Sequence, residues 1–240
     1  MTEGLDSFLD AYGDDFAYAF DNAIILNWYP RRIMARFPSH AHVLELGIGH
    51  GLTCNHFAQH FEEYHVIDGS SAVIAKFRKS YPNAPITLHE GYFENFETDR
   101  RFDLIVMGFV LEHVDDPALI LRRFRQFLKP NGKVVMTVPN AESLHRQLGQ
   151  AAGLLPDLMQ LGDGDRALGH VRNFTLQTLT SMIETAGYRV TSSEGLFLKP
   201  FTTSQLKSLS LSKPIIDALC KIGVQHPELS AALMVEAEAA

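Results

Sequence analysis

Three glycines at alternate positions constrain this chain more than any other feature of its sequence. Gly47, Gly49 and Gly51 follow a short apolar run over residues 42–46 and precede a segment with helical spacing over residues 52–61. Glycine permits the backbone of a tight turn and lets a ligand approach closely. In open α/β sheets, a glycine-rich turn between a strand and a helix is typical of the ligand-binding edge. The turn therefore predicts a binding site at that edge.

The order of apolar segments predicts a mostly parallel sheet. We expect further strands over residues 64–68, 86–89, 102–107, 133–138 and 188–200. Helices are expected over residues 71–80, 117–128 and 175–186, with Ser70 or Ser71 as an N-cap and Gly187 closing the last of them. A turn is expected over residues 129–132, and a loop over residues 162–165. Residues 5–37 and the end from Ser204 are expected to be helical, with Pro30 ending or restarting the first segment.

Composition excludes several classes of protein. The 240 residues carry 46% hydrophobic residues and a net charge of −7, which fits one globular domain and disfavours a nucleic-acid partner. No apolar run approaches the roughly 20 residues of a membrane span. The acidic N-terminus does not resemble a signal peptide, and Cys54 and Cys220 follow no metal or disulfide spacing. We therefore expect a cytoplasmic protein that does not contact membranes.

The glycine-rich turn differs from a dinucleotide-binding turn. That turn has two residues before its last glycine, whereas this chain has one, and Glu45 precedes the glycines. An acid there disfavours a pyrophosphate and suits a cationic ligand, although Glu45 also fits a structural role as a helix cap. Asp68 follows about 20 residues later, at the end of the second expected strand. Its carboxylate suits the two hydroxyls of a ribose, or the N-terminus of the next helix.

Four segments together resemble the motifs of class I S-adenosylmethionine (SAM)-dependent methyltransferases. Residues 45–51 resemble the first motif of that family, and Asp68 matches its second-strand acid. Residues 102–113 resemble its fourth-strand motif, and residues 128–133 resemble its turn into strand five. The resemblance covers about residues 40–140, in matching order. Residues 170–175 also resemble a segment of many small-molecule members.

The resemblance implies a Rossmann-like α/β fold with a mostly parallel seven-stranded sheet and helices on both faces. It implies one domain over residues 1–240, with an N-terminal helical cap (1–40), a cofactor-binding core (41–140) and a substrate-side insertion (141–174). SAM is the implied cofactor. Its implied contacts are Glu45, Gly47, Gly49, Gly51, Asp68, Gly69, Tyr92, Phe93, Gly108 and Phe109.

Two departures from the family pattern bear on the site. Many members carry an acid after the third strand, often in a Gly-Asp pair, whereas this chain has Gly91 followed by Tyr92. The Asn/Asp-Pro-Pro-Tyr/Phe run of members that methylate amino groups or nucleic acids is missing from the fourth-strand motif. This disfavours those substrates.

The acceptor side is less strongly specified. His113 and His170 are candidate general bases, because imidazole titrates near neutrality. Either could instead pack or order a loop. Arg172 beside His170 could hold a substrate anion or order the same loop. Further candidate substrate contacts, with packing as the alternative for each, are Tyr12, Trp28, Tyr29 and His145. No metal site is expected, since His56 and His60 lack a third ligand at a matching position.

The sequence therefore predicts transfer of a methyl group to a small molecule, with oxygen as the first choice of acceptor atom. N- or C-methylation remains an alternative within the class, and a non-catalytic SAM-binding module is an alternative outside it. An oxidoreductase that uses NAD is disfavoured by the spacing of the glycines. A homodimer is left open.

Overall fold

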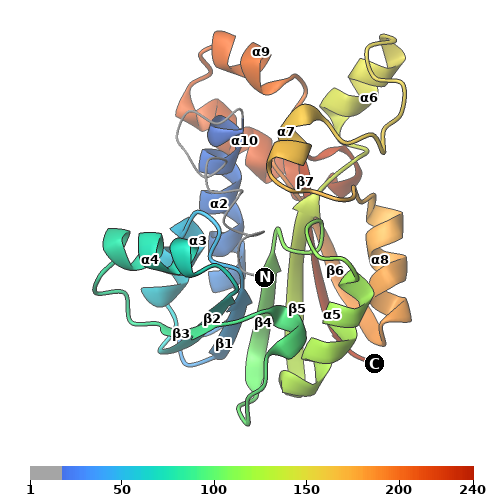
Figure 1. The fold of residues 1–240 in the computed structure, drawn as a ribbon. Coiled ribbons are helices and arrows are strands. Elements are labelled where there is room, and N and C mark those ends of the chain that lie inside the picture. The colour runs from blue at the N-terminus through green and yellow to red at the C-terminus, as the bar shows by residue number, and fades with distance from the viewer. Residues whose placement is uncertain (1–17) are drawn as a thin grey trace.

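The computed structural model describes residues 18–240, so Tyr12 lies outside the described residues. Within them the chain forms a seven-stranded sheet in the order β3-β2-β1-β4-β5-β7-β6 (Figure 1). The strands are β1 (His42–Leu46), β2 (Glu63–Asp68), β3 (Thr87–Glu90), β4 (Phe102–Gly108), β5 (Leu128–Pro139), β6 (Tyr188–Leu196) and β7 (Ala232–Ala239). The expected seven-stranded sheet is confirmed.

The sheet is parallel except around its last strand. β1 to β5 pair in parallel, whereas β7 runs antiparallel to both β5 and β6. The chain order reverses between β1 and β4, because β2 and β3 continue on one side and β5 on the other. Ligands bind outside the carboxyl ends of the strands at such a reversal.

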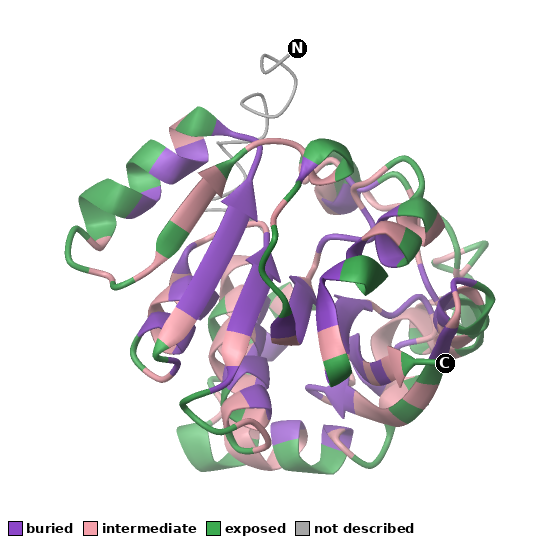
Figure 2. Cartoon of the chain, turned by 90° about the horizontal axis from the view of Figure 1, so that it is seen from below, coloured by how far each residue is buried: buried purple, intermediate pink, exposed green. Residues whose placement is uncertain are grey.

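Helices cover both faces of the sheet. One face packs against α2 (Ala19–Met34), α3 (Leu52–Ala58), α4 (Ser71–Ser80), α9 (Thr203–Ser208) and α10 (Lys213–Gly223). The other packs against α5 (Pro117–Phe124) and α8 (Leu176–Thr185). β4 serves both cores, since Leu104 and Val106 face the first and Ile105 and Met107 face the second. The central strands are buried as this arrangement requires (Figure 2).

Two short helices and a loop lie over the carboxyl edge of the sheet. They are α6 (Leu144–Ala151) and α7 (Asp163–Ala167), which are drawn above the strand ends in Figure 1.

Two helices of the sheet's flanks end or begin as the sequence predicts. Ser70 caps the start of α4 by accepting a hydrogen bond from the N–H of Val73. Gly187 closes α8 with a φ of +91°.

The C-terminal segment was expected to be helical, which is wrong for its last residues. Alanine and glutamate favour helices. In the structure, however, successive side chains of residues 232–239 point to opposite faces of the sheet. Leu233 and Val235 lie in one core, Met234 lies in the other, and Glu236 and Glu238 pair with Lys133. Burial on both faces between β5 and β6 outweighs the helix propensity.

Four smaller expectations also need correction. α2 runs through Pro30, which is buried, so packing against the sheet offsets the lost backbone hydrogen bond. Residues 129–132 belong to β5, where Asn131 has a φ of +63° and the register with β4 shifts. The helix after Asp116 gives way to a 3₁₀ turn at Arg125. The expected loop over residues 162–165 contains the start of α7.

Across residues 18–240, the helices are too short or too polar for any of them to cross a bilayer.

Candidate cofactor and acceptor site

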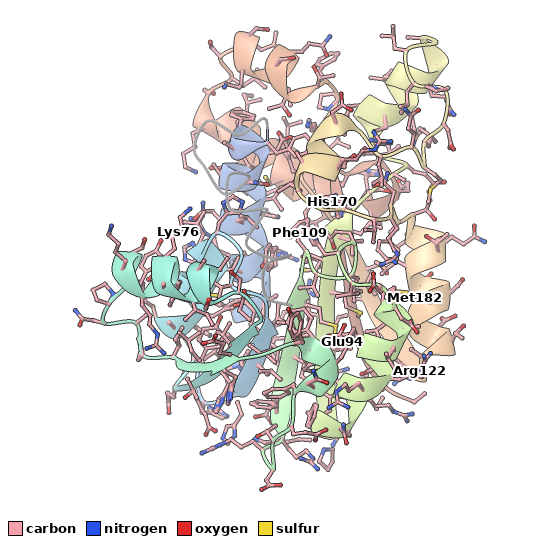
Figure 3. The ribbon with its side chains drawn as sticks, viewed as in Figure 1. Lys76, Glu94, Phe109, Arg122, His170 and Met182 are labelled. Carbon is pink, nitrogen blue, oxygen red and sulfur yellow. The ribbon has the colours of Figure 1, made fainter. Side chains whose placement is uncertain are left out.

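A cavity of about 490 Å³ opens at the carboxyl edge of the sheet, a volume in the range of small-molecule sites. The turn after β1, the ends of β2 to β5, α2 and residues 145–173 supply its walls. Phe109 and His170, both labelled in Figure 3, line it. The cavity brings together predicted residues from both sides of the reversal: Tyr29, Gly47, Gly49, Asp68, Gly69, Tyr92, Phe93, Gly108, Phe109, His113, His145 and His170.

Glycine is required at positions of this turn for different structural reasons. Gly47, Gly49 and Gly51 have φ angles of +80°, +52° and +75°, which other residues rarely adopt. A Cβ at Gly51 would lie 2.8 Å from the ring of Phe77, so this glycine lets α4 pack against the turn. A Cβ at Gly49 would meet no atom within 4 Å, and Gly49 lines the cavity. The backbone at Gly49 is therefore open to a ligand.

Asp68 ends β2 inside the cavity wall and is 9% exposed. One carboxylate oxygen accepts from the N–H of Ile48 at 2.8 Å and the other from the N–H of Ser70 at 2.8 Å. These bonds tie Asp68 to the glycine-rich turn. Because Asp68 lines the cavity, its carboxylate can also accept hydrogen bonds from a bound ligand. Because Ser70 caps α4, the capping role considered for Asp68 is not needed.

We expect Asp68→Asn to weaken SAM binding by about 1.5–3 kcal/mol, or about 10- to 150-fold in Kd. The amide keeps one acceptor but loses the charge and the second acceptor that two ribose hydroxyls require. Calorimetric titration of SAM measures the change. Asp103→Asn is the matched control, since Asp103 accepts from the N–H of His42 at the opposite edge of the sheet. Equal Kd values in wild type and Asp68→Asn would contradict the assignment.

Glu45 was expected to contact the cofactor directly, and the structure places it elsewhere. Its side chain is 1% exposed and does not line the cavity. It accepts hydrogen bonds from the Thr53 hydroxyl at 2.9 Å, the Cys54 thiol at 3.3 Å and the Tyr64 hydroxyl. Burial raises the pKa of this carboxyl from 4.5 to about 7, against the lowering effect of these bonds. Glu45 thus joins β1, β2 and α3 beneath the turn.

This burial makes folding stability depend on pH. Between the unfolded value near 4.5 and the folded value near 7, the folded chain holds the proton more tightly. The free energy of unfolding should therefore fall as pH rises through this window, by roughly 3 kcal/mol in total from Glu45. Denaturant unfolding of wild type and Glu45→Gln from pH 4.5 to 8 measures it. The variant should lack this contribution; parallel curves for the two proteins would refute it.

The exit of β4 lies against the aromatic side chains of the cavity. A Cβ on Gly108 would lie 2.4 Å from the hydroxyl of Tyr29, so only glycine fits there. Phe109 follows with a φ of +56°, held by a hydrogen bond from its N–H to the carbonyl of Thr137 at 2.9 Å. The rings of Tyr29 and Phe109 meet edge to face at 6.0 Å. Tyr29 is 1% exposed, so it supports the cavity wall as well as lining it.

His113 and His170 meet in the cavity although 57 positions separate them in sequence. Their rings lie 4.7 Å apart, edge to face. Burial, then His170, lowers the pKa of His113 to about 4, and burial lowers the pKa of His170 against the raising effect of Asp165. Nδ1 of His170 lies 3.8 Å from Asp165 Oδ1, beyond hydrogen-bond distance. Both rings are therefore neutral and available to a ligand near pH 7.

Glu112 completes this cluster, and the sequence analysis did not single it out. Its side chain is fully buried, and both carboxylate oxygens lack a hydrogen-bond partner among the described residues. Burial raises the pKa of Glu112 to about 8. The sequence feature that could have pointed to Glu112 is its position next to His113, at the end of the fourth-strand motif. The sequence analysis considered only the histidine there.

A second polar group in the cavity wall consists of Asp21, His145 and Lys199. Lys199 is 4% exposed and donates to Asp21 and, at 2.9 Å, to Thr203. The second oxygen of Asp21 is buried without a partner in the described structure, as is Nδ1 of His145. Burial lowers the pKa of His145 to about 3, helped by Lys199. Sequence reasoning missed Asp21 and Lys199 because they come from opposite ends of the chain.

Two substrate contacts expected from the sequence do not reach the cavity. Arg172 donates to the carbonyls of Leu111, Val114 and Asp115, so it orders the loop after β4 and holds no substrate anion. Together with the bond from the N–H of Val171 to the carbonyl of Glu112, at 2.9 Å, it places His170 beside His113. Trp28, in α2, packs against the core and does not line the cavity.

Comparison with known proteins agrees with this geometry. Residues 25–193 match the family model described as a methyltransferase domain. A ubiquinone biosynthesis O-methyltransferase of Rhodopseudomonas palustris is 32% identical over 100 residues, or 41% of this chain and 40% of that protein. A probable S-adenosylmethionine-dependent methyltransferase of Mycolicibacterium smegmatis is 28% identical over 155 residues, or 65% of this chain and 54% of that protein. The chain thus matches about half, or less, of the length of these curated relatives.

Among solved structures, an N-methyltransferase of Bradyrhizobium japonicum in complex with S-adenosylhomocysteine superimposes with a TM-score of 0.59. It is 14% identical, and the match covers 98% of this chain and 97% of that one. At this identity the likeness concerns the fold. The family model spans more than half of the chain and includes the glycine-rich turn, Asp68 and the exit of β4. The chain therefore belongs to the class I SAM-dependent methyltransferase family, whose cofactor is SAM.

Proposed function

We propose that this protein transfers the methyl group of SAM to a hydroxyl oxygen of a small molecule. The observation that carries the proposal is the set of buried polar atoms without hydrogen-bond partners in the cavity wall. Both oxygens of Glu112 and Nδ1 of His170 are of this kind among the described residues. A buried polar atom without a partner is costly, so the ligand that belongs there should form hydrogen bonds with these atoms. A hydroxyl group can donate and accept such bonds, and it offers an oxygen for methylation.

The residues at the other end of the cavity fit SAM. The open backbone at Gly49 and the carboxylate of Asp68 in the cavity wall suit a ribose and its neighbours, while Tyr92 and Phe93 offer apolar surface for adenine. SAM supplies, when bound, a methyl group already activated on a sulfonium. The chain's task is then to hold the acceptor oxygen in line and to exclude water. In this proposal Glu112, His113 and His170 bind the acceptor hydroxyl, and His113 or His170 takes its proton.

The proposal also includes the role of the insertion, the size of the substrate and the location in the cell. Residues 141–174 act as the substrate-side insertion, because α6, α7 and His170 lie over the strand ends. The net charge of −7 and the mostly apolar cavity fit a small molecule rather than a polyanion. Both cysteines are buried free thiols, which fits a reducing cytoplasm. The R. palustris relative is itself an O-methyltransferase by name.

The test is a panel of acceptors that differ only in the receiving atom. Purified protein and SAM labelled in the methyl group are incubated with catechol or ortho-phenylenediamine, and with an aliphatic vicinal diol or the corresponding diamine. We expect label on the oxygen compounds. Label on the nitrogen compounds alone would replace O-methylation by N-methylation. SAM binding without transfer to any acceptor across a wider metabolite panel would favour a non-catalytic module.

A further inference from the structure

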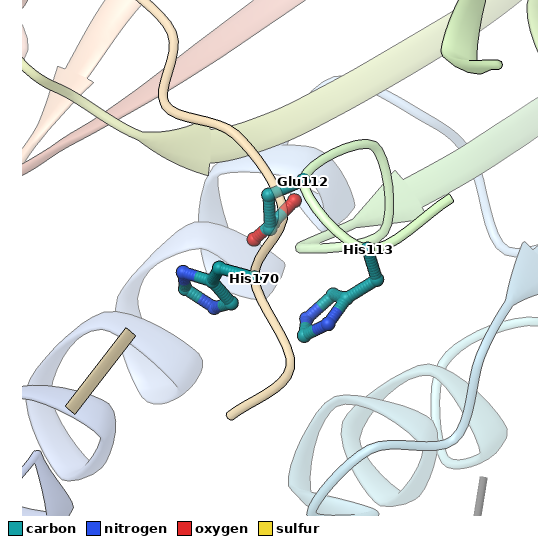
Figure 4. Close-up of side chains that lie close together, drawn as sticks. All are labelled: Glu112, His113 and His170. Atoms are coloured by element: carbon teal, nitrogen blue, oxygen red, sulfur yellow. The ribbon is translucent and has the colours of Figure 1, made fainter. Parts of the chain in front are cut away.

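Glu112, His113 and His170 form a compact set of metal-ligand atoms in the cavity wall. One ligand atom from each lies within 4.8 Å of the other two. Glu112 and His113 come from the loop after β4, and His170 comes from the segment after α7 (Figure 4). The two segments are joined by the hydrogen bond from the N–H of Val171 to the carbonyl of Glu112. A backbone hydrogen bond therefore holds together the two segments that carry these side chains.

The cluster lacks an internal partner for its acid. Glu112 is fully buried and His170 is 9% exposed, yet the carboxylate oxygens and Nδ1 of His170 have no hydrogen bond among the described residues. The guanidinium of Arg172 lies near Glu112, but its hydrogen bonds go to backbone carbonyls. Buried carboxyl groups are normally hydrogen-bonded, paired with a cation or bound to a metal. This burial without a partner is a second observation that points to a ligand.

We propose that Glu112, His113 and His170 bind a divalent first-row transition-metal ion at the acceptor end of the cavity. Two imidazoles and one carboxylate suit Zn²⁺, Mn²⁺, Fe²⁺ or Co²⁺ better than Mg²⁺ or Ca²⁺, which prefer oxygen ligands alone. Metal–ligand bonds of about 2.0–2.2 Å would draw the donor atoms to roughly 3–4 Å from one another. Rotation of the three side chains is enough, because the backbone is already in place.

The three ligands leave coordination positions that face the cavity, since all three residues line it. A ligand oxygen placed there would be polarised by the ion, and a bound hydroxyl would lose its proton more readily. This last consequence rests on the proposed hydroxyl acceptor, whereas binding of the ion does not. His145 and the Asp21–Lys199 pair also line the cavity, lie outside the cluster and serve as internal controls.

The test measures metal binding without catalysis. Untagged protein is treated with a chelator, dialysed and titrated with Co²⁺, followed by visible absorption, and with Zn²⁺ and Mn²⁺ by calorimetry. We expect one ion per chain, and at least tenfold weaker binding, or about 1.4 kcal/mol, in Glu112→Gln and His170→Ala. His145→Ala should bind the ion as wild type does. SAM titration and circular dichroism of each variant confirm that it is folded.

Failure to bind any of the three ions would overturn the proposal, as would wild-type affinity in folded Glu112→Gln. A metal that binds equally weakly to all variants, including His145→Ala, would place it elsewhere and also overturn the assignment. The acceptor panel is read separately from these titrations. Metal binding together with label on nitrogen compounds would refute the hydroxyl acceptor and leave the metal site intact.

Discussion

Replacing His170 by alanine should lower the turnover of methyl transfer by about 10²- to 10⁴-fold, the usual contribution of a group that assists removal of a proton. Affinity for SAM should stay near that of wild type, because His170 lies at the acceptor end of the cavity, away from the glycine-rich turn. The same loss is expected whether the imidazole acts directly or holds an ion. Initial rates at saturating SAM, with SAM titration in parallel, give both quantities.

The matched control for His170→Ala is His65→Ala. His65 is 5% exposed, stacks on His89 and does not line the cavity, so its loss removes a buried imidazole without touching the site. We expect lower stability but near-normal turnover. Near-normal turnover in both His170→Ala and His113→Ala would show that the reaction needs neither imidazole. The acceptor would then be a carboxylate or an amine, and the cluster would serve structure alone.

The second large effect concerns Gly49. Gly49→Val should abolish measurable SAM binding, since its side chain would enter open space that we assign to the cofactor. Valine at a φ of +52° also strains the backbone by about 1–2 kcal/mol or more. Strain alone therefore has to be separated from occlusion. Differential scanning calorimetry reports the strain, and calorimetric titration of SAM reports the occlusion.

Gly153 offers the matched control for that separation. It has a φ of +73°, and a Cβ there would also meet no atom within 4 Å, but the residue is exposed and away from the cavity. Gly153→Val should lose a similar amount of stability and keep full SAM affinity. Retained SAM binding in Gly49→Val would mean that the cofactor does not lie against the turn.

Local patterns are enough to propose the cofactor end of the site. The turn at Gly47 to Gly51 and the acid at Asp68 are set by φ angles and by the period of two neighbouring strands, and both can be recognised over a few residues. Glu45 shows the limit of this reasoning. Its position in the motif was clear, but the direction of its side chain depends on Tyr64 and Thr53, which receive it beneath the turn.

The acceptor end was harder to predict because distant segments build it. Arg172 appeared as a candidate for binding an anion, but three carbonyls of the loop after β4 take its hydrogen bonds. Glu112 resembled an ordinary residue of a motif until the fold buried it without a partner. The strand β7 was missed because alanine and glutamate suggested a helix, and the neighbours that enforce the strand lie about 40 and 100 residues away.

The pair of Asp21 and Lys199 links the first described helix to the segment after β6 across 178 positions of sequence. The wall opposite the glycine-rich turn thus draws on both ends of the chain, whereas the turn, Asp68 and the exit of β4 come from one continuous stretch. Substitutions in the outer segments can reshape what is methylated while the stretch that holds SAM stays unchanged. In a lineage of such proteins, acceptor preference can diversify faster than the cofactor site, and exchange of the outer segments between relatives is a route to new acceptors.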